Sequence, residues 1–298
     1  MSLINFIKKI FKKKCSLKSI NKEELDKEIS KFNSCGINDT QRTPRLIVSL
    51  TSFPQRMHDI HYCLYSLLTQ TLKPDMIILW LAEEQFPDKE NDIPQEVLNL
   101  QKFGLTIKWC KNLYSYKKLI PTLEEFPNDI IITTDDDIFY EKDCIEKLYK
   151  SYIETPDTIS CHRCHRIKTG KNGEILSYKK WTKKISGESV SFKNFFTGAG
   201  AVLYPPHSLY KDVKNIELFT KLAPHADDIW FWAMAVLNNT QIKVVKNNIK
   251  TNTYINPERE RGLTGELTLF ASNKKGGNDI QMMNILKNYP PLKEIINK

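Results

Sequence analysis

A short apolar run leads directly into three consecutive aspartates, Asp135, Asp136 and Asp137. The run, residues 129–134, contains three isoleucines and ends at a polar break, which predicts a buried strand of a parallel sheet. In open α/β sheets, ligands collect outside the carboxyl ends of the strands, where these aspartates would lie. Three adjacent carboxylates repel one another unless a cation or solvent compensates their charge. The segment therefore predicts an α/β fold with a ligand site at this strand end.

Grouped carboxylates at a strand end suit a hard divalent cation. Mg²⁺ and Mn²⁺ take oxygen ligands, often one or two carboxylates together with phosphate oxygens of a substrate. We therefore expect Mn²⁺ or Mg²⁺ as a cofactor of this site. An aspartate-rich turn between a strand and a helix is the alternative interpretation, because aspartate caps helices well.

Strand-like and helix-like segments alternate along the first half of the chain, which predicts a largely parallel sheet flanked by helices. The strands are expected at residues 45–50, 76–81, 105–109 and 129–134, and the helices at 21–31, 58–69 and 117–125. The second half is less regular. Its strands are expected at 158–167 and 175–178 around a turn at 170–173, and its helices at 227–237 and 280–287.

Length and composition permit one large domain with a sizeable core, because the chain has 298 residues and 41% of them are apolar. No segment approaches the roughly 18 consecutive apolar residues that a transmembrane helix requires. The N-terminal apolar stretch is interrupted by Lys8 and Lys9 and lacks the cleavage site of a signal peptide. We therefore expect a cytoplasmic protein whose seven scattered cysteines are reduced thiols.

Positive charge is concentrated at the N-terminus of a chain whose net charge is +9. On a helix, the apolar residues among positions 3–11 share one face and most lysines among positions 8–14 occupy the other. Such a helix suits an anionic membrane surface, with a disordered or core-docked basic tail as the alternative. We expect residues 1–40 to form a helical appendage, peripheral on the inner face of the cytoplasmic membrane, and residues 41–298 to form the main domain. No stacking platform for bases is evident, so no nucleic-acid partner is expected.

The segment from Cys161 to His165 reads C-x-x-C-H, the spacing of a haem attachment motif, and it also contains up to four zinc ligands. Haem attachment would require export, and a structural zinc site would require a second ligand pair elsewhere. We interpret the segment as part of the strand at 158–167, with side chains alternating between core and surface.

A second acidic pair, Asp227 and Asp228, opens the helix expected over residues 227–237. A helix N-terminus stabilises carboxylates, so an ordinary helix cap explains the pair on its own. Together with the triplet, the pair allows one carboxylate group to hold a metal-bound diphosphate while the other accepts a proton from an attacking hydroxyl. The glycines of Gly198-Ala199-Gly200 do not open a helix as a dinucleotide loop would, and they indicate close approach of the backbone to a ligand or another strand.

Four segments, in this order, resemble GT-A glycosyltransferases, in particular the bacterial family-2-like enzymes of capsule, lipooligosaccharide and O-antigen synthesis. The segments are VSLTSFP at 48–54, TTDDDIFY at 133–140, the glycine-containing stretch at 198–206 and DDIW at 227–230. The resemblance covers about residues 44–285. It implies the GT-A α/β fold and a hexosyltransferase-like enzyme. The implied donor is a nucleoside-diphosphate sugar, UDP-sugar foremost, and the implied acceptor is a glycan or lipid-linked glycan. Direct displacement would invert the anomeric centre, with a retaining mechanism as the alternative.

The resemblance also implies roles for the donor-side residues. Asp135 and Asp137 would form the metal site, with Asp137 a direct ligand that bridges to the diphosphate. Asp135 would lie near the nucleotide ribose or a metal-bound water, and Asp136 would help to shape the site. The remaining donor contacts would be a nucleotide-binding loop and one phosphate-binding lysine, namely Thr51, Ser52, Arg56 and Lys118.

On the acceptor side, the resemblance implies Asp228 as catalytic base and Asp227 as the residue that positions the acceptor. Many GT-A enzymes supply a further metal ligand, often histidine, near the C-terminus, but no histidine follows His225 here. The candidates to replace it are Asn273, Asn278 and Asp279, or water. Loop cations that would close over the donor are Arg259, Arg261, Lys274 and Lys275.

Two alternative functions remain compatible with the sequence. A metal-dependent nucleotidyltransferase or phosphohydrolase also binds phosphates through metal-bound aspartates. A non-catalytic module that binds sugars or membranes would keep the fold without turnover.

Overall fold

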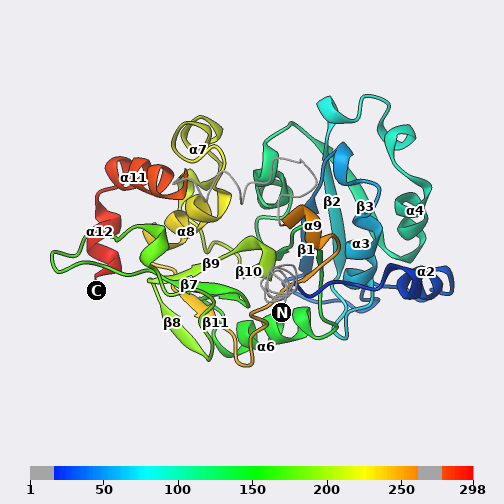
Figure 1. Ribbon diagram of the computed structural model, residues 1–298, viewed down its shortest axis with the longest axis horizontal. Helices are drawn as coiled ribbons and strands as arrows, with labels where there is room; N and C mark the ends of the chain where they lie inside the picture. Colours follow the sequence, from blue (N-terminus) through cyan, green and yellow to red (C-terminus); the bar gives the residue numbers. More distant parts are fainter. Residues whose placement is uncertain (1–16, 261–276, 298) are drawn as a thin grey trace, which may run out of the picture.

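The structure is a computed structural model that describes residues 17–260 and 277–297 (Figure 1). At its centre is an eight-stranded mixed sheet with the order β3-β2-β1-β4-β10-β6-β11-β8. Its strands are β1 (Leu46–Thr51), β2 (Met76–Ala82), β3 (Leu105–Cys110), β4 (Ile130–Thr133), β6 (Ile159–Cys161), β8 (Ser189–Ser191), β10 (Val202–Tyr204) and β11 (Ile242–Val244). Two smaller sheets pair β5 (Ile138–Phe139) with β12 (Thr253–Tyr254), and β7 (Cys164–Arg166) with β9 (Asn194–Phe196).

The first four strands form the parallel half of the large sheet. β1 pairs in parallel with β2 and β4, and β2 pairs in parallel with β3. These are the four strands expected from the sequence, and each observed end lies within one residue of the predicted end. Because β1 and β4 are parallel neighbours, the segments that follow them, residues 52–56 and 135–137, lie at the same edge of the sheet.

The other half of the sheet is mixed. β10 runs antiparallel between β4 and β6, and β11 pairs in parallel with β6 and antiparallel with β8. The prediction of one strand over 158–167 is wrong, because the chain leaves the large sheet after Cys161 and enters a small one at Cys164. His162 lies at this break, fully buried, where its Nδ1 accepts a hydrogen bond from Ile249 N and its Nε2 contacts Cys144 O at 2.9 Å.

The expected hairpin is only partly formed. Gly170 N donates to Glu174 O, and Gly173 has φ +76°, which confirms the turn at 170–173. The strand predicted at 175–178 is wrong, because these residues contribute an isolated bridge between Thr169 and Ile175 and then enter the 3₁₀ turn η6 (Tyr178–Lys180).

Helices flank the large sheet, and the core lies between them and the sheet. In Figure 1, α3 and α4 lie beside the parallel strands, while α7, α8, α11 and α12 gather at the opposite end of the molecule. The helices are α2 (Lys22–Ser30), α3 (Ile60–Leu68), α4 (Gln95–Leu98), α5 (Ile120–Glu125), α6 (Cys144–Glu154), α7 (Ile216–Leu222), α8 (Asp227–Leu237), α9 (Pro257–Glu260), α11 (Asn278–Asn288) and α12 (Pro291–Ile296). α8 has the predicted bounds, and its residues Ile229 to Val236 are all buried in the core.

The start of the described chain packs against the main body. α2 is capped by the Asn21 side chain, its Leu25 is buried, and Tyr62 of α3 donates a hydrogen bond to Asp26 at 2.7 Å. The basic helix predicted from the first residues falls almost wholly outside the described part of the chain. Within residues 17–260 and 277–297, no helix is both long and apolar enough to cross a bilayer.

Candidate active site

Four segments meet at the carboxyl edge of the parallel strands. They are the residues that follow β1, the aspartates that follow β4, the 3₁₀ helix η5 (Tyr114–Lys118), and the turn η7 (Gly198–Gly200) beside the first turn of α8. Hydrogen bonds and ion pairs join these segments into one cluster of charged side chains. The aspartate triplet and the later acidic pair thus belong to a single site.

Asp136 and Asp137 are held by the segment after β1. Asp136 is 7% exposed, and its carboxylate accepts hydrogen bonds from Ser52 Oγ at 2.5 Å and from Arg56 Nη1 at 2.6 Å. The same Arg56 nitrogen donates to Asp137 Oδ2 at 2.7 Å. Burial raises the pKa of Asp136, and the Arg56 charge opposes that shift. Ser52 and Arg56, expected to contact the nucleotide, therefore also fix the conformation of the triplet.

Lys118 links the triplet to the acidic pair. Its Nζ lies 2.8 Å from Asp135 Oδ1 and 2.8 Å from Asp227 Oδ2. Burial disfavours the ammonium charge, yet the carboxylates of Asp135, Asp227 and Asp228 outweigh burial and raise the pKa of Lys118 well above its ordinary value. Lys118 is therefore a cation at the junction of the two acidic groups, whereas the sequence alone suggested only a phosphate contact.

Asp228 is held by the backbone of η7. Gly198 N donates to the two carboxylate oxygens at 3.0 and 3.1 Å. Burial, reinforced by the neighbouring charge of Asp227, raises the pKa of Asp228 from its ordinary 3.8 to about 7, while Lys118 opposes the shift. A carboxylate with a pKa near neutrality is suited to accept and release a proton at physiological pH.

Gly198 is the point where these groups converge. A Cβ atom on Gly198 would lie 2.5 Å from Lys118 Nζ, 3.0 Å from Asp228 Oδ1 and 3.3 Å from Asp135 Oδ1. The missing side chain therefore leaves room for one ammonium and two carboxylates around a common point. The glycines predicted a close approach of the backbone to a ligand or another strand, and in the structure the backbone at Gly198 closely approaches three charged side chains.

We expect Gly198→Ala to fold and lose activity, and Gly200→Ala to lose stability. At position 198 the methyl group meets the tip of a flexible lysine, which can move aside and disturb the charged cluster. At position 200 it would lie 2.3 Å from Arg163 Cβ and 2.7 Å from Arg163 N, which cannot move without the backbone. Thermal unfolding and donor turnover of both variants check this. Full activity of Gly198→Ala would contradict the convergence at this residue.

Ser115 and Tyr140 belong to the site but were not identified from the sequence. Ser115 Oγ donates to Asp227 Oδ1 at 2.9 Å, and Asp135 N donates to the Tyr140 hydroxyl at 2.8 Å. Ser115 carries a detectable signal, because residues three apart share a face of a 3₁₀ helix and Ser115 is three residues before Lys118. This spacing identifies Ser115 only if the segment is known to be a 3₁₀ helix, which the sequence did not reveal.

Two predicted donor contacts are engaged elsewhere in the structure. Thr51 Oγ1 donates to Trp80 O of the neighbouring strand at 2.8 Å. The prediction that Arg259 lies on a mobile loop is wrong, because Arg259 is in α9, is 1% exposed and pairs with Asp59 at 3.1 Å. The other proposed loop cations, Arg261, Lys274 and Lys275, fall outside the described residues.

The candidates for a late metal ligand are not brought to the triplet by any described contact. Asp279 Oδ1 accepts a hydrogen bond from Tyr178 N at 2.6 Å. Asn278 begins α11 and is 8% exposed. Asn273 falls outside the part of the chain that the structure describes.

The triplet fits a metal ion that is bound together with substrate. Among the described residues, no three His, Cys, Asp or Glu side chains are grouped so as to hold a metal ion. The side chains of Asp135 and Asp137 are 29% and 14% exposed, whereas that of Asp136 is 9% exposed. Two accessible carboxylates match Mg²⁺ or Mn²⁺, which take one or two carboxylates and complete their shell with phosphate and water. They do not form a closed protein cage.

The C-x-x-C-H segment serves the interior of the fold. His165 Nδ1 accepts a hydrogen bond from Lys184 N at 3.1 Å, and burial lowers the pKa of His165 to about 3 and of His162 to about 4. Cys161 and Cys164 are buried free thiols. These contacts agree with the interpretation of the segment as structural.

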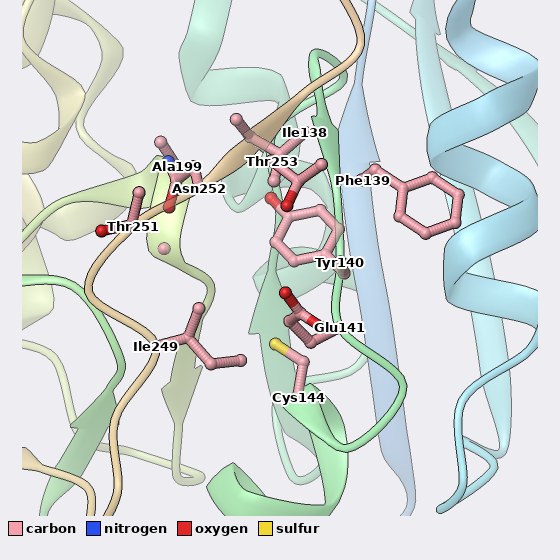
Figure 2. Close-up of a pocket in the computed structure, with 11 residues that line it drawn as sticks. Ile138, Phe139, Tyr140, Glu141, Cys144, Ala199, Ile249, Thr251, Asn252 and Thr253 are labelled. Carbon is pink, nitrogen blue, oxygen red and sulfur yellow. The ribbon is translucent and has the colours of Figure 1, made fainter. Parts of the chain in front are cut away.

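A small cavity lies next to η7, as Figure 2 shows, with Ala199, Thr251 and Asn252 on one side and Tyr140 and Cys144 on the other. Its volume is about 10 Å³, which holds about one water molecule. The Asn252 Nδ2 atom is buried without a hydrogen-bond partner among the described residues, so a water there would satisfy it. The cavity is too small for a sugar, and none of the predicted site residues lines it.

No protein-family profile and no curated protein sequence matches the chain. Solved structures do resemble it. The mannosyltransferase PcManGT from Pyrobaculum calidifontis, in complex with GDP-Man and Mn²⁺, is 13% identical, with a TM-score of 0.51 over 91% of this chain and 73% of that one. TarS 1–349 of S. aureus is 15% identical, with a TM-score of 0.47 over 83% of this chain and 73% of that one. The first of these likenesses establishes the fold: the chain has the mixed α/β architecture of GT-A proteins.

Proposed function

We propose that the protein is a metal-dependent glycosyltransferase that moves a sugar from a nucleoside-diphosphate sugar to an acceptor hydroxyl. The observation that carries this proposal is the junction at Lys118 and Gly198, where the aspartate triplet and Asp228 approach one point. Such a site can hold a leaving diphosphate on one side and a proton acceptor on the other. The GT-A fold agrees with this chemistry, and the mannosyltransferase that shares it was solved with GDP-Man and Mn²⁺.

On the donor side, Asp135 and Asp137 would hold Mn²⁺ or Mg²⁺ together with the donor diphosphate. When bound, the ion would neutralise the negative charge of the leaving diphosphate. Arg56 would keep Asp136 and Asp137 oriented, since one guanidinium nitrogen already contacts both carboxylates. The nucleotide, a uridine diphosphate foremost, would lie against the segment that contains Thr51 and Ser52.

On the acceptor side, Asp228 would accept the proton of the acceptor hydroxyl as its oxygen attacks the anomeric carbon. The new bond joins that oxygen to the anomeric carbon while the bond from this carbon to the diphosphate oxygen breaks. A single displacement of this kind inverts the anomeric configuration and passes through an oxocarbenium-like transition state. Gly198 N–H would hold the carboxylate in position, and Asp227 would position the acceptor.

The acceptor would be a glycan or lipid-linked glycan of the bacterial surface, as the resemblance implies for capsule and lipopolysaccharide enzymes. The basic residues at positions 8–14, outside the described part of the chain, would hold the enzyme at an anionic membrane. Deletion of residues 1–18 should then abolish co-sedimentation with anionic vesicles. Unchanged co-sedimentation would refute the membrane placement.

A thermal-shift screen of nucleotide sugars, with Mn²⁺ or with EDTA, tests donor and metal together. A donor at about one hundred times its Kd stabilises the folded state by about 2.7 kcal/mol and raises Tm by several degrees. We expect one nucleotide class to do so with Mn²⁺, and the shift to disappear with EDTA or in Asp137→Ala. An equal rise in Tm with Mn²⁺, with EDTA and in Asp137→Ala would exclude the proposed metal site.

A further inference from the structure

Among the described residues, two cations beside the bridge between Arg166 and Thr182 have no carboxylate partner. Arg163 lies in the turn between β6 and β7, and Lys183 follows the turn η6. Across residues 17–259 and 277–297, no Asp or Glu oxygen lies within 4.0 Å of a nitrogen of either side chain. Arg163 and Lys183 are named the cation pair below.

Arg163 is tied to the backbone that holds Asp228. Its Nη1 donates to Thr197 Oγ1 at 2.6 Å, and Thr197 N donates back to Arg163 O at 3.1 Å. The next residue, Gly198, donates its N–H to Asp228. The guanidinium therefore contacts the residue directly before the hydrogen-bond donor of the proposed base.

Lys183 shares an aromatic neighbour with Arg163 and Asp228. Its Nζ lies 3.0 Å from the centroid of the Tyr178 ring. Burial raises the pKa of Tyr178 to about 12, with the Arg163 cation opposing this shift and the Asp228 carboxylate adding to it. Arg163 and Asp228 therefore both act on the Tyr178 phenol. The backbone holds Lys183 beside the segment that follows Arg163, because Arg166 N donates to Thr182 O at 2.8 Å and Ile185 N donates to Cys164 O at 2.9 Å.

The two cations also disfavour each other. Lys183 is exposed as a whole residue, but partial burial of its ammonium group, followed by the like charge of Arg163, lowers the pKa of Lys183 to about 8. Asp279 is the carboxylate that opposes this shift, but it lies beyond ion-pair distance and accepts a hydrogen bond from Tyr178 N. Cations arranged in this way, without a counter-charge among the described residues, favour an anion supplied from outside. Arginine in particular binds phosphate and carboxylate through parallel hydrogen bonds.

We propose that the cation pair binds a phosphate or carboxylate group of the acceptor, so that the enzyme glycosylates a negatively charged glycan. The inference rests on the proposed glycosyl transfer and adds the chemical class of its acceptor. The donor diphosphate is expected at Asp135 and Asp137, whereas Arg163 approaches the turn η7 at Thr197 and Gly200. The anion therefore belongs to the substrate whose hydroxyl meets Asp228.

Binding of simple probes tests the acceptor class. Glucose 1-phosphate, glucuronate and neutral methyl glucoside are titrated into the protein with UDP and Mn²⁺ present, and binding is followed by NMR. We expect an anionic probe to bind about tenfold or more tightly than methyl glucoside, because hydrogen bonds between charged groups are stronger than those to neutral groups. Comparison of the phosphate with the carboxylate identifies which anion the site prefers.

Charge-neutralising variants test the residues. Lys183→Gln and Arg163→Gln should each lower the affinity for the preferred anionic probe by about tenfold or more. The affinity for methyl glucoside should stay unchanged in both variants. Lys180→Gln and Arg166→Gln are matched controls from the same region, because Lys180 is exposed and Arg166 is half-buried and bonded to Ser189. Lys183 is exposed, so its variant is expected to fold even if Arg163→Gln does not.

Three results would overturn the inference. The first is equal affinity for the charged and neutral probes. The second is control variants that weaken binding as much as the test variants do. The third is weaker binding of UDP or GDP by the test variants, which would assign the cation pair to the donor. Failure of the proposed function has a different signature, because then no nucleotide sugar would be turned over to nucleoside diphosphate, whichever probe the cation pair binds.

Discussion

Replacement of Asp228 by asparagine is expected to lower kcat by about 10²–10⁴-fold and to leave donor affinity unchanged. Asparagine keeps the shape of the side chain and can still accept the Gly198 N–H, but it cannot take a proton from the acceptor. Steady-state rates and donor titration measure the two effects. Asp212→Asn is the matched control, because Asp212 accepts a hydrogen bond from Tyr289 at 2.9 Å and takes no part in the site. A variant with kcat near that of the wild type would refute the assignment of the base.

The pH profile gives an independent test of the same residue. A base must be ionised to act, so the wild-type rate should rise with pH and level off above the pKa of Asp228, about 7. The Asp228→Asn variant should lose this rise, because its side chain does not titrate. A profile that keeps the same inflection in the variant would assign the titration to another group.

The raised pKa also has a consequence for stability. Between the ordinary value of 3.8 and the folded value of about 7, the folded protein keeps a proton on Asp228 that the unfolded chain releases. Unfolding therefore releases a proton in this window, and stability falls as pH rises from about 4 to 7. At pH 8, Asp228→Asn should consequently have a higher Tm than the wild type, and this difference should vanish towards pH 4. A lower Tm at pH 8 would contradict the buried charge at this position.

Replacement of Lys118 by methionine is expected to lower the free energy of unfolding by about 3–5 kcal/mol. The change keeps much of the side-chain volume but leaves Asp135, Asp227 and Asp228 without the cation that lies 2.8 Å from two of them. The loss should shrink as pH is lowered, because protonated carboxylates no longer need a counter-charge. Urea unfolding at pH 8 and pH 5 measures both effects.

The adjacent residue provides the control. Lys117 is also buried, at 2% exposed, but its Nζ contacts the neutral oxygens Ser52 O and Gln85 Oε1 at 3.3 and 3.1 Å. Burial lowers the pKa of Lys117, in contrast to Lys118. Lys117→Met should therefore cost only about 1–2 kcal/mol, with little dependence on the charge of the aspartates. Equal losses in the two variants would mean that Lys118 contributes by packing and not by pairing with carboxylates.

The parallel strands and the long helix at Asp227 were predictable because their signals are local. β1 to β4 are continuous apolar runs with polar ends, and α8 starts at an acidic pair that suits a helix N-terminus. The prediction of one strand at 158–167 was wrong because the sequence pattern continues through His162. The burial of His162 depends on its contacts with Cys144 and Ile249, which are distant in the sequence. α6 and α12 were not predicted. α6 is amphipathic and α12 begins with a proline, and each of these patterns indicates a helix.

Many residues of the site were predictable from the sequence, but the contacts between them were not. The two acidic groups follow from motif and strand position, and the glycines of η7 indicated a close approach. The conformation of η5 places Lys118 between Asp135 and Asp227, and no spacing in the sequence specifies this position. Arg163 is missing from the predicted site because its segment was interpreted as strand, where its contact with Thr197 has no local signal.

Real-time ¹H NMR can follow donor turnover with Mn²⁺, using the nucleotide sugar that the thermal-shift screen identifies. We expect release of nucleoside diphosphate together with a sugar product of inverted anomeric configuration. We also expect Asp137→Ala to abolish this turnover and Asp228→Asn to slow it by about 10²–10⁴-fold. Release of nucleoside monophosphate or orthophosphate, or turnover that persists in both variants, would contradict a site divided between the aspartate triplet and Asp228.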